Sequence, residues 1–156
     1  MKLLKLLDKR LILTHKDIPS KKALLHKLSS VFASVTSVDC QARLFDAFIE
    51  RENLGSTALG HGVAIPHIRS DLFCQPLFSV IKLDNRIDYG AEDHRDVDII
   101  FSLIAPEKNS NEHLILLSEC SKLLSSSTFR QQLRATCTAD EIIQLITSTI
   151  ENVEPA

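Results

Sequence analysis

The chain has 156 residues, of which 44% are hydrophobic and 24% are charged, and its formal net charge at pH 7 is −2. A chain of this length forms one domain whose core needs no disulfide or metal. Because the 18 basic residues form no block, nucleic acid is not expected as a partner. No apolar run approaches the roughly 20 residues of a membrane span, so membrane insertion is not expected either. We expect one domain over residues 1–156, with any flexibility confined to residues 1–10 and 150–156.

The N-terminal segment mixes leucines with basic residues, but it lacks the unbroken apolar stretch and the cleavage site of a signal peptide. A cytoplasmic location is therefore expected. The cysteines are widely separated and form no C-x-x-C motif, so we expect reduced, mostly buried thiols. They are Cys40, Cys74, Cys120 and Cys137.

Two amphipathic helices are predicted in the first third of the chain. Apolar residues at steps of three and four predict a helix from Lys21 to Val35, with Ser20 as its N-cap after Pro19. A second helical pattern runs from about Val38 to Arg51 and ends before Gly55.

Strand patterns occupy the middle of the chain. A loop leads into a brief apolar strand, Val63 to Ile65, which Pro66 stops. The segment Leu77 to Leu83 is rich in β-branched and aromatic residues and predicts a second strand. The run Val97 to Ile104 is almost entirely apolar, which predicts a strand buried on both faces.

The last third of the chain is helical in pattern. One helix follows residues 109–111, Ser127 is the expected cap of a short helix, and Thr138 with Glu141 forms a capping box for a third. The expected apolar positions are Leu114, Leu117, Leu124, Phe129, Leu133, Ile142, Ile143, Leu145 and Ile146. Helices, then strands, then helices predict an α/β domain with a mixed sheet of about five strands between helices.

The segment from Gly55 to His67 carries the most chemical information, since it holds three of the chain's four glycines, two hydroxyl side chains and two of its histidines. Successive backbone N–H groups in glycine-rich turns can bind an anion, here beside an imidazole. The candidate anion-binding residues are Ser56, Thr57, Gly60, His61 and Gly62. The alternative is a tight loop whose histidines are merely polar surface groups.

Other site types fit this segment poorly. It matches neither the Walker A motif nor the dinucleotide fingerprint. No carboxylate stands at the H-E-x-x-H offset, and no G-x-S-x-G elbow is present. Neither a metal nor a cofactor is expected.

Residues 50–57 and 59–67 together resemble the phosphohistidine signature of enzyme IIA of the fructose/mannitol type, from the bacterial phosphotransferase system. The similarity is closest to the nitrogen-regulatory branch of that family. It continues through residues 97–106, 111–114, 129–134 and 138–146, so that nearly the whole chain is covered as one enzyme IIA type 2 domain.

This resemblance implies that His67 is the phosphorylated nucleophile, that Arg51 stabilises the phosphoryl group and that His113 lies across the pocket. A neutral imidazole is a good nucleophile near pH 7, and a guanidinium matches phosphate oxygens. The alternatives are that Arg51 interacts only with the dipole of its helix and that His113 is a cap or surface group. The remaining histidines, His15, His26 and His94, have no motif around them and are expected to be solvated.

Two positions depart from the family pattern. Ile68 stands where a small residue, often Gly, usually follows the active histidine, and its branched side chain could narrow the docking surface. His61 stands where Asn is common, and it could replace the Asn as a donor or add a pH-dependent charge.

The resemblance implies a phosphocarrier that is phosphorylated by an HPr-type carrier protein, from a chain of donors that starts at phosphoenolpyruvate. We expect no fused membrane or sugar-phosphorylating domain, and this expectation favours a regulatory, nitrogen-type role with target proteins as partners. The alternatives are a sugar-transport enzyme IIA that passes the group to an enzyme IIB, and a binding module without phosphotransfer.

Overall fold

The computed structural model describes residues 1–108 and 110–153 of the chain. Its helices and strands follow one another in an order that begins and ends with helices. They are η1 (Lys2–Leu6), η2 (Lys9–Leu11), β1 (Ile12–Lys16), α1 (Lys21–Ala33), α2 (Gln41–Asn53), β2 (Ala58–Gly60), β3 (Val63–Ala64), β4 (His67–Ser70), β5 (Leu77–Ile87), β6 (Val97–Pro106), α3 (Ser110–Leu124), α4 (Ser127–Ala135) and α5 (Ala139–Val153).

The strands form one mixed sheet in the order β1-β5-β6-β3-β2, with β4 also paired to β6. Strand β6 is antiparallel to β5 and parallel to both β3 and β4. Strand β3 lies opposite Ile99 and Ile100, whereas β4 lies opposite residues 103–106, so β3 and β4 follow each other along one edge of β6. The α/β class and the mixed sheet are confirmed, with six strands where about five were expected.

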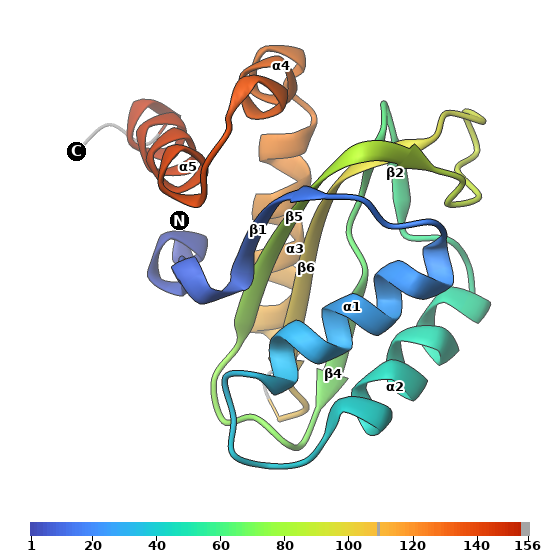
Figure 1. The fold of residues 1–156 in the computed structure, drawn as a ribbon. Helices are drawn as coiled ribbons and strands as arrows, with labels where there is room; N and C mark the ends of the chain where they lie inside the picture. The colour runs from blue at the N-terminus through green and yellow to red at the C-terminus, as the bar shows by residue number, and fades with distance from the viewer. Residues whose placement is uncertain (109, 154–156) are drawn as a thin grey trace.

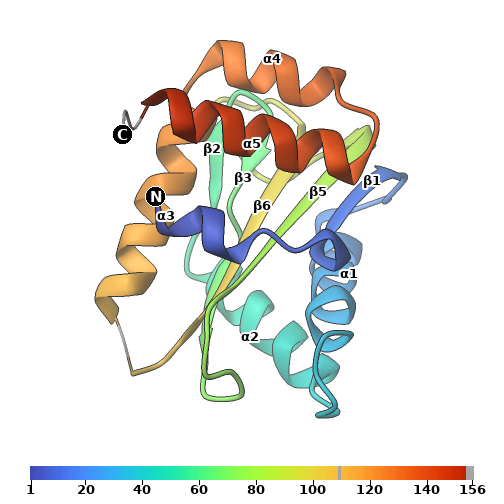
Figure 2. The same cartoon turned by 90° about the vertical axis from the view of Figure 1, so that its left-hand side faces the viewer.

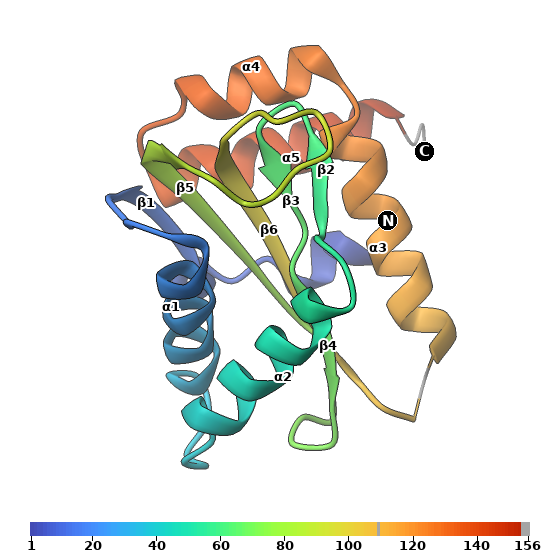
Figure 3. The same cartoon turned by 90° about the vertical axis from the view of Figure 1, so that its right-hand side faces the viewer.

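Helices cover both faces of the sheet (Figure 1). Helices α1 and α2 lie on one face (Figure 3), while α3, α4, α5 and the N-terminal segment lie on the other (Figure 2). Alternate residues of β6 serve the two cores, since Ile100 and Ile104 pack with α1 and α2, whereas Ile99, Phe101 and Leu103 pack on the opposite side. Burial of this strand on both faces is confirmed, because all its residues from Ile99 to Ala105 are buried.

The predicted helix caps are largely confirmed. The Ser20 hydroxyl accepts a hydrogen bond from the Ala23 N–H, at 3.1 Å. The cap of α4 is Ser126 and not Ser127, because the Ser126 hydroxyl accepts from the Phe129 N–H. The Thr138 hydroxyl accepts from the Glu141 N–H as predicted, but the Glu141 carboxylate reaches back to the N–H of Cys137.

Three strands were not predicted from the sequence: β1, β2 and β4. Strand β4 has only four residues, of which Ile68 alone is apolar, and its strand character comes from pairing with the buried β6. The break between β3 and β4 is local, because Pro66 has no N–H to donate to the sheet. Its carbonyl still accepts from the Leu103 N–H and from the Ser102 hydroxyl.

The described part of the chain has helices near both ends, and the cysteines differ in part from expectation. In residues 1–10, Leu3 is fully buried, and the backbone N–H groups of Lys2 and Leu3 donate to the Glu119 carboxylate. At the other end α5 runs to Val153, and residues 154–156 lie outside the described part. The expectation of mostly buried thiols is wrong for two of the four free cysteines: Cys40 and Cys120 are buried, whereas Cys74 and Cys137 are exposed.

Among the described residues, no helix combines the length and the apolar character needed to cross a bilayer.

Candidate functional site

The start of β4 places His67 beside the central strand. His67 pairs with Leu103 of β6 and follows directly on the Pro66 break in the edge of the sheet. Its Nδ1 lies 2.7 Å from the carbonyl oxygen of Ile65. Because a carbonyl oxygen can only accept, Nδ1 carries the hydrogen and donates it. In the neutral ring, Nε2 therefore holds the free lone pair.

His67 opens onto a cavity of about 360 Å³ that three elements build together. Helix α2 contributes one wall, β4 contributes the floor, and α3 contributes the opposite side. We call this cavity the His67 pocket, and it is lined by Ala47, Glu50, Arg51, Leu54, His67, Ile68, Arg69 and His113. The structure thus brings together the three residues to which the resemblance gives a catalytic role. A larger cavity of about 710 Å³, between the N-terminal segment and α3, contains none of the predicted site residues.

Burial keeps the two pocket histidines neutral. Desolvation lowers the pKa of His67, and the charge of Arg51 lowers it further, while the Ile65 hydrogen bond and Glu52 oppose the shift. Desolvation also lowers the pKa of His113 to about 4, with further contributions from His67, Arg69 and Arg51. At pH 7 the pocket therefore holds neutral imidazole rings beside guanidinium cations.

His113 is not the surface group that one interpretation allowed. Only 6% of the residue is exposed, and its ring centroid lies 5.3 Å from that of His67. Its Nδ1 is the one buried side-chain nitrogen or oxygen without a hydrogen-bond partner among the residues that the model describes. A buried polar atom without a partner is costly, so the contacts within the protein do not by themselves account for the position of this ring.

Arg51 lies in the last turn of α2, and its guanidinium donates to the Gly55 carbonyl at 3.0 Å. Arg51 therefore lies where its charge can interact favourably with the dipole of α2, because cations stabilise the C-terminal end of a helix. The side chain nevertheless also lines the pocket. Arg69, which sequence reasoning did not single out, adds a second guanidinium from β4.

The hydroxyl side chains of the glycine-rich loop do not point into the His67 pocket. The Ser56 hydroxyl donates to the Tyr89 carbonyl and accepts from the Ala58 N–H. The Thr57 hydroxyl is buried and donates to the Glu52 carboxylate across 2.6 Å. Both hydroxyl groups are thus engaged within the protein and not offered to a bound anion.

The rest of the loop lies at the β2–β3 turn, away from β4 (Figure 3). Gly60 and His61 line a different cavity, together with Glu92, Asp93 and Arg95. The exposed His61 donates its backbone N–H to the Asp93 carboxylate at 2.8 Å. The structure therefore separates these loop residues from His67. On the same turn, Arg134 of α4 donates to the carbonyl of His61, next to Gly62.

Ile68 is buried, whereas the histidines without a surrounding motif are exposed. Ile68 is 5% exposed and packs into the core on the α1–α2 side, so its side chain forms pocket wall and not a protrusion. His15, His26 and His94 are all exposed, as predicted.

Sequence reasoning missed Glu52, which follows Arg51 in α2. Its side chain is 4% exposed and accepts from the backbone and the hydroxyl of Thr57. A signal was present, because Leu44, Phe48 and Glu52 repeat at steps of four and therefore share the buried face of α2.

Comparison with known proteins identifies the family. The family model described as "Phosphoenolpyruvate-dependent sugar phosphotransferase system, EIIA 2" matches residues 5–149. The chain belongs to this family. This match confirms the resemblance to enzyme IIA type 2 that the sequence around His67 indicated.

Its relatives support the nitrogen-regulatory branch. The nitrogen regulatory protein of Pseudomonas aeruginosa is 36% identical over 128 residues, which cover 81% of this chain and 82% of the relative. The crystal structure of the nitrogen regulatory protein IIA-Ntr from Neisseria meningitidis has a TM-score of 0.88 at 30% identity, and covers 94% of this chain and 99% of that one.

A more distant solved structure shares the fold alone. It is the complex of mannitol enzyme IIA with phosphorylated mannitol enzyme IIB from Escherichia coli. Its TM-score is 0.76 at 17% identity, with 91% of this chain and 97% of that one covered.

Proposed function

We propose that this enzyme IIA chain is a phosphocarrier in which His67 accepts a phosphoryl group from a phosphorylated HPr-type carrier. The donor chain would start at phosphoenolpyruvate. The observation that carries the proposal is the state of the His67 ring, whose Nδ1 donates to the Ile65 carbonyl and leaves the Nε2 lone pair for attack. The lowered pKa of His67 supports the same role, because it keeps the ring neutral at pH 7.

In the proposed step a bond forms between His67 Nε2 and phosphorus, while the bond between phosphorus and the donor's imidazole nitrogen breaks. The donor nitrogen keeps the electron pair of the broken bond. The transition state spreads negative charge over three equatorial oxygens, so catalysis depends on positioning and on positive groups. In this pocket Arg51 and Arg69 would supply the charge, and the neutral His113 would supply a hydrogen bond.

We further infer that the role is regulatory, as the names of its nitrogen regulatory relatives suggest. A phosphoryl group adds about −1.5 to −2 charge at pH 7. In a pocket lined by two arginines, this addition would change the charge of the surface on which target proteins dock. The proposal places the chain in the cytoplasm, where its phosphoryl donors are made.

A second candidate is a transport enzyme IIA that passes the group on to an enzyme IIB. It is favoured by the shared fold with the mannitol enzyme IIA that was solved in complex with phosphorylated enzyme IIB. The discriminating test incubates the phosphorylated chain with purified fructose-type and mannitol-type enzyme IIB. Rapid loss of the group to either one would favour transport, whereas retention would favour regulation.

Phosphorylation itself is tested by intact mass after incubation with phosphoenolpyruvate, enzyme I and the HPr-type carrier. We expect one acid-labile phosphoryl group on the unmodified chain and none on His67→Ala. The matched control is His61→Ala, which removes an exposed histidine outside the pocket and keeps phosphorylation. Failure of the unmodified chain to accept the group from a competent carrier would overturn the proposal and favour a binding module without transfer.

A further inference from the structure

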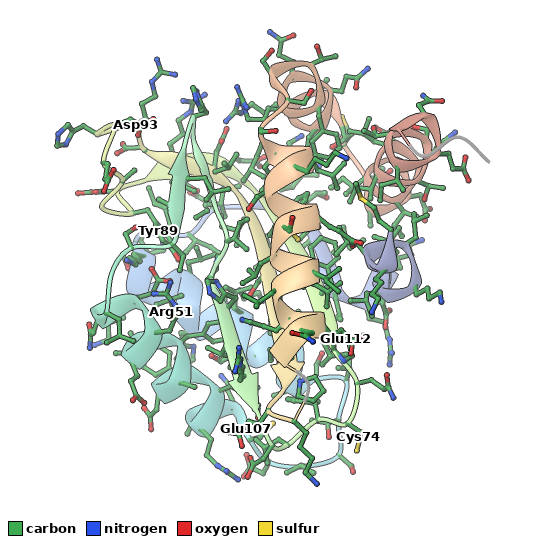
Figure 4. All side chains as sticks on the ribbon, turned by 180° about the vertical axis from the view of Figure 1, so that it is seen from behind. Arg51, Cys74, Tyr89, Asp93, Glu107 and Glu112 are labelled. Carbon is green, nitrogen blue, oxygen red and sulfur yellow. The ribbon has the colours of Figure 1, made fainter. Side chains whose placement is uncertain are left out.

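A buried polar network lies behind the His67 pocket, and Thr57 is at its centre. The Thr57 hydroxyl donates to Glu52 Oε2 at 2.6 Å, and it lies 3.1 Å from the Tyr89 hydroxyl. Because the Thr57 hydroxyl has one hydrogen, it accepts from Tyr89. Figure 4 shows Tyr89 and Arg51 on the same side of the molecule.

The network is fully hydrogen-bonded. Glu52 Oε1 accepts from the Thr57 N–H at 3.1 Å and pairs with Lys21 Nζ at 3.0 Å. Lys21 Nζ also donates to the Tyr89 carbonyl and lies 4.3 Å from the centre of the Tyr89 ring. A buried carboxylate with three donors is held in one geometry, because loss of any partner leaves a charge incompletely compensated.

Thr57 connects this network to both functional side chains. Its carbonyl accepts from the Ile65 N–H at 3.0 Å, and the Ile65 carbonyl in turn accepts from Nδ1 of His67. Two residues before Thr57, the Gly55 carbonyl accepts from the Arg51 guanidinium at 3.0 Å. One residue therefore fixes the backbone that holds the nucleophile and the backbone that holds the guanidinium.

We propose that Thr57, held by Glu52 and Tyr89, is a positioning residue that sets the guanidinium of Arg51 relative to the imidazole of His67. This inference rests on the proposed phosphocarrier function. It differs from the role expected from the sequence, since the Thr57 hydroxyl is bound to Glu52 and Thr57 does not line the pocket. Displacement of catalytic groups by about 1 Å can lower the rate about a hundredfold. A residue that fixes the relative position of the Arg51 and His67 side chains should therefore affect the rate of transfer.

The test compares Thr57→Val with Thr57→Ser in single-turnover transfer from the phosphorylated HPr-type carrier. Valine keeps the shape but removes the hydroxyl, whereas serine keeps the hydroxyl. We expect Thr57→Val to lower the maximal transfer rate about tenfold or more, with the carrier concentration at half-maximal rate little changed. Thr57→Ser should restore most of the rate.

The same substitution in an Arg51→Ala background separates positioning from general destabilisation. If Thr57 acts through Arg51, the loss caused by Thr57→Val should shrink by at least about fivefold once the guanidinium is gone. An equal loss in both backgrounds, or an undiminished rate in Thr57→Val alone, would overturn the inference.

Tyr89→Phe provides a second variant should Thr57→Val fail to fold. It removes only the hydroxyl that donates to Thr57 and leaves the buried ring in place, and we expect a smaller loss of maximal rate with the same dependence on Arg51. A rate equal to that of the unmodified chain would contradict the inference. The unmodified chain is measured alongside, so a chain that is never phosphorylated refutes the proposed function, whereas normal transfer by the variants refutes only the positioning role.

Discussion

His67 donates from Nδ1 to the carbonyl of Ile65, two residues earlier in the chain, across 2.7 Å. Pro66 stands between them with a backbone φ that its ring restricts, so the geometry of this short contact is locally determined. The hydrogen bond selects the tautomer whose Nε2 is unprotonated. A local feature of the backbone thus decides which ring nitrogen can act as nucleophile.

The stability of the fold should fall between pH 6.5 and 4, in part because of His113. Its pKa is lowered from 6.5 to about 4 in the folded chain, mainly by burial. Below pH 6.5 the unfolded chain binds a proton that the folded chain does not, so stability decreases as the pH falls. The slope from one such group approaches about 1.4 kcal/mol per pH unit.

Urea unfolding of the unmodified chain and of His113→Gln, at several values between pH 7 and 4.5, measures this contribution. We expect the variant to lose less stability over the interval, since glutamine does not titrate. Identical slopes for the two proteins would show that His113 takes up its proton normally in the folded state.

Leu54 should contribute to carrier docking and not to folding. It is 82% exposed at the edge of the His67 pocket, and isolated apolar groups at such positions become anchors when a partner covers them. For Leu54→Ser we expect the carrier concentration at half-maximal rate to rise about tenfold, with the maximal rate unchanged. The control is Leu59→Ser, which is 46% exposed on β2 outside the pocket, and an equal effect of both substitutions would argue against a docking role.

A side chain at position 62 should destabilise the fold for two separate reasons. The φ of Gly62 is +81°, and an added Cβ would lie 2.6 Å from the Arg134 guanidinium, which is held by Asp98 and by the His61 carbonyl. The matched control is Gly90, with a φ of +77° and nothing within 4 Å of an added Cβ.

Gly90→Ala should therefore lower the free energy of unfolding only by the cost of a positive φ in a residue with a Cβ, about 1–2 kcal/mol. Gly62→Ala should lose clearly more, because the Arg134 contacts are displaced as well. The free energy of unfolding in urea measures both variants. Equal losses would mean that Arg134 moves aside at little cost.

Apart from the two-residue strand β3, the parts of the fold that were predicted have patterns that are local and long. Helix α1 was recognised from its apolar period and Ser20 cap, and β6 from its continuous apolar run. Strands β1, β2 and β4 have at most five residues each, and their identity depends on partners far away in the chain. No local pattern contains that information.

The functional site was likewise predicted only in part from the sequence. The sequence indicated a special segment at Gly55 to His67, but spacing alone could not show that Arg51 and His113 converge on His67, since they belong to different elements. It also could not show which acceptor a hydroxyl would choose. Thr57 was interpreted as an anion ligand, whereas its hydroxyl is bound to the buried Glu52.

The position of the phosphoryl group on the phosphorylated chain provides the sharpest test of the proposed phosphocarrier function. Nitrogen-15 labelled protein is phosphorylated through the HPr-type carrier, and the imidazole signals of His67 are recorded by long-range proton–nitrogen NMR. We predict phosphorus on Nε2, with Nδ1 still protonated against the Ile65 carbonyl. Phosphorus on Nδ1 of His67, or on any other residue, would contradict the account.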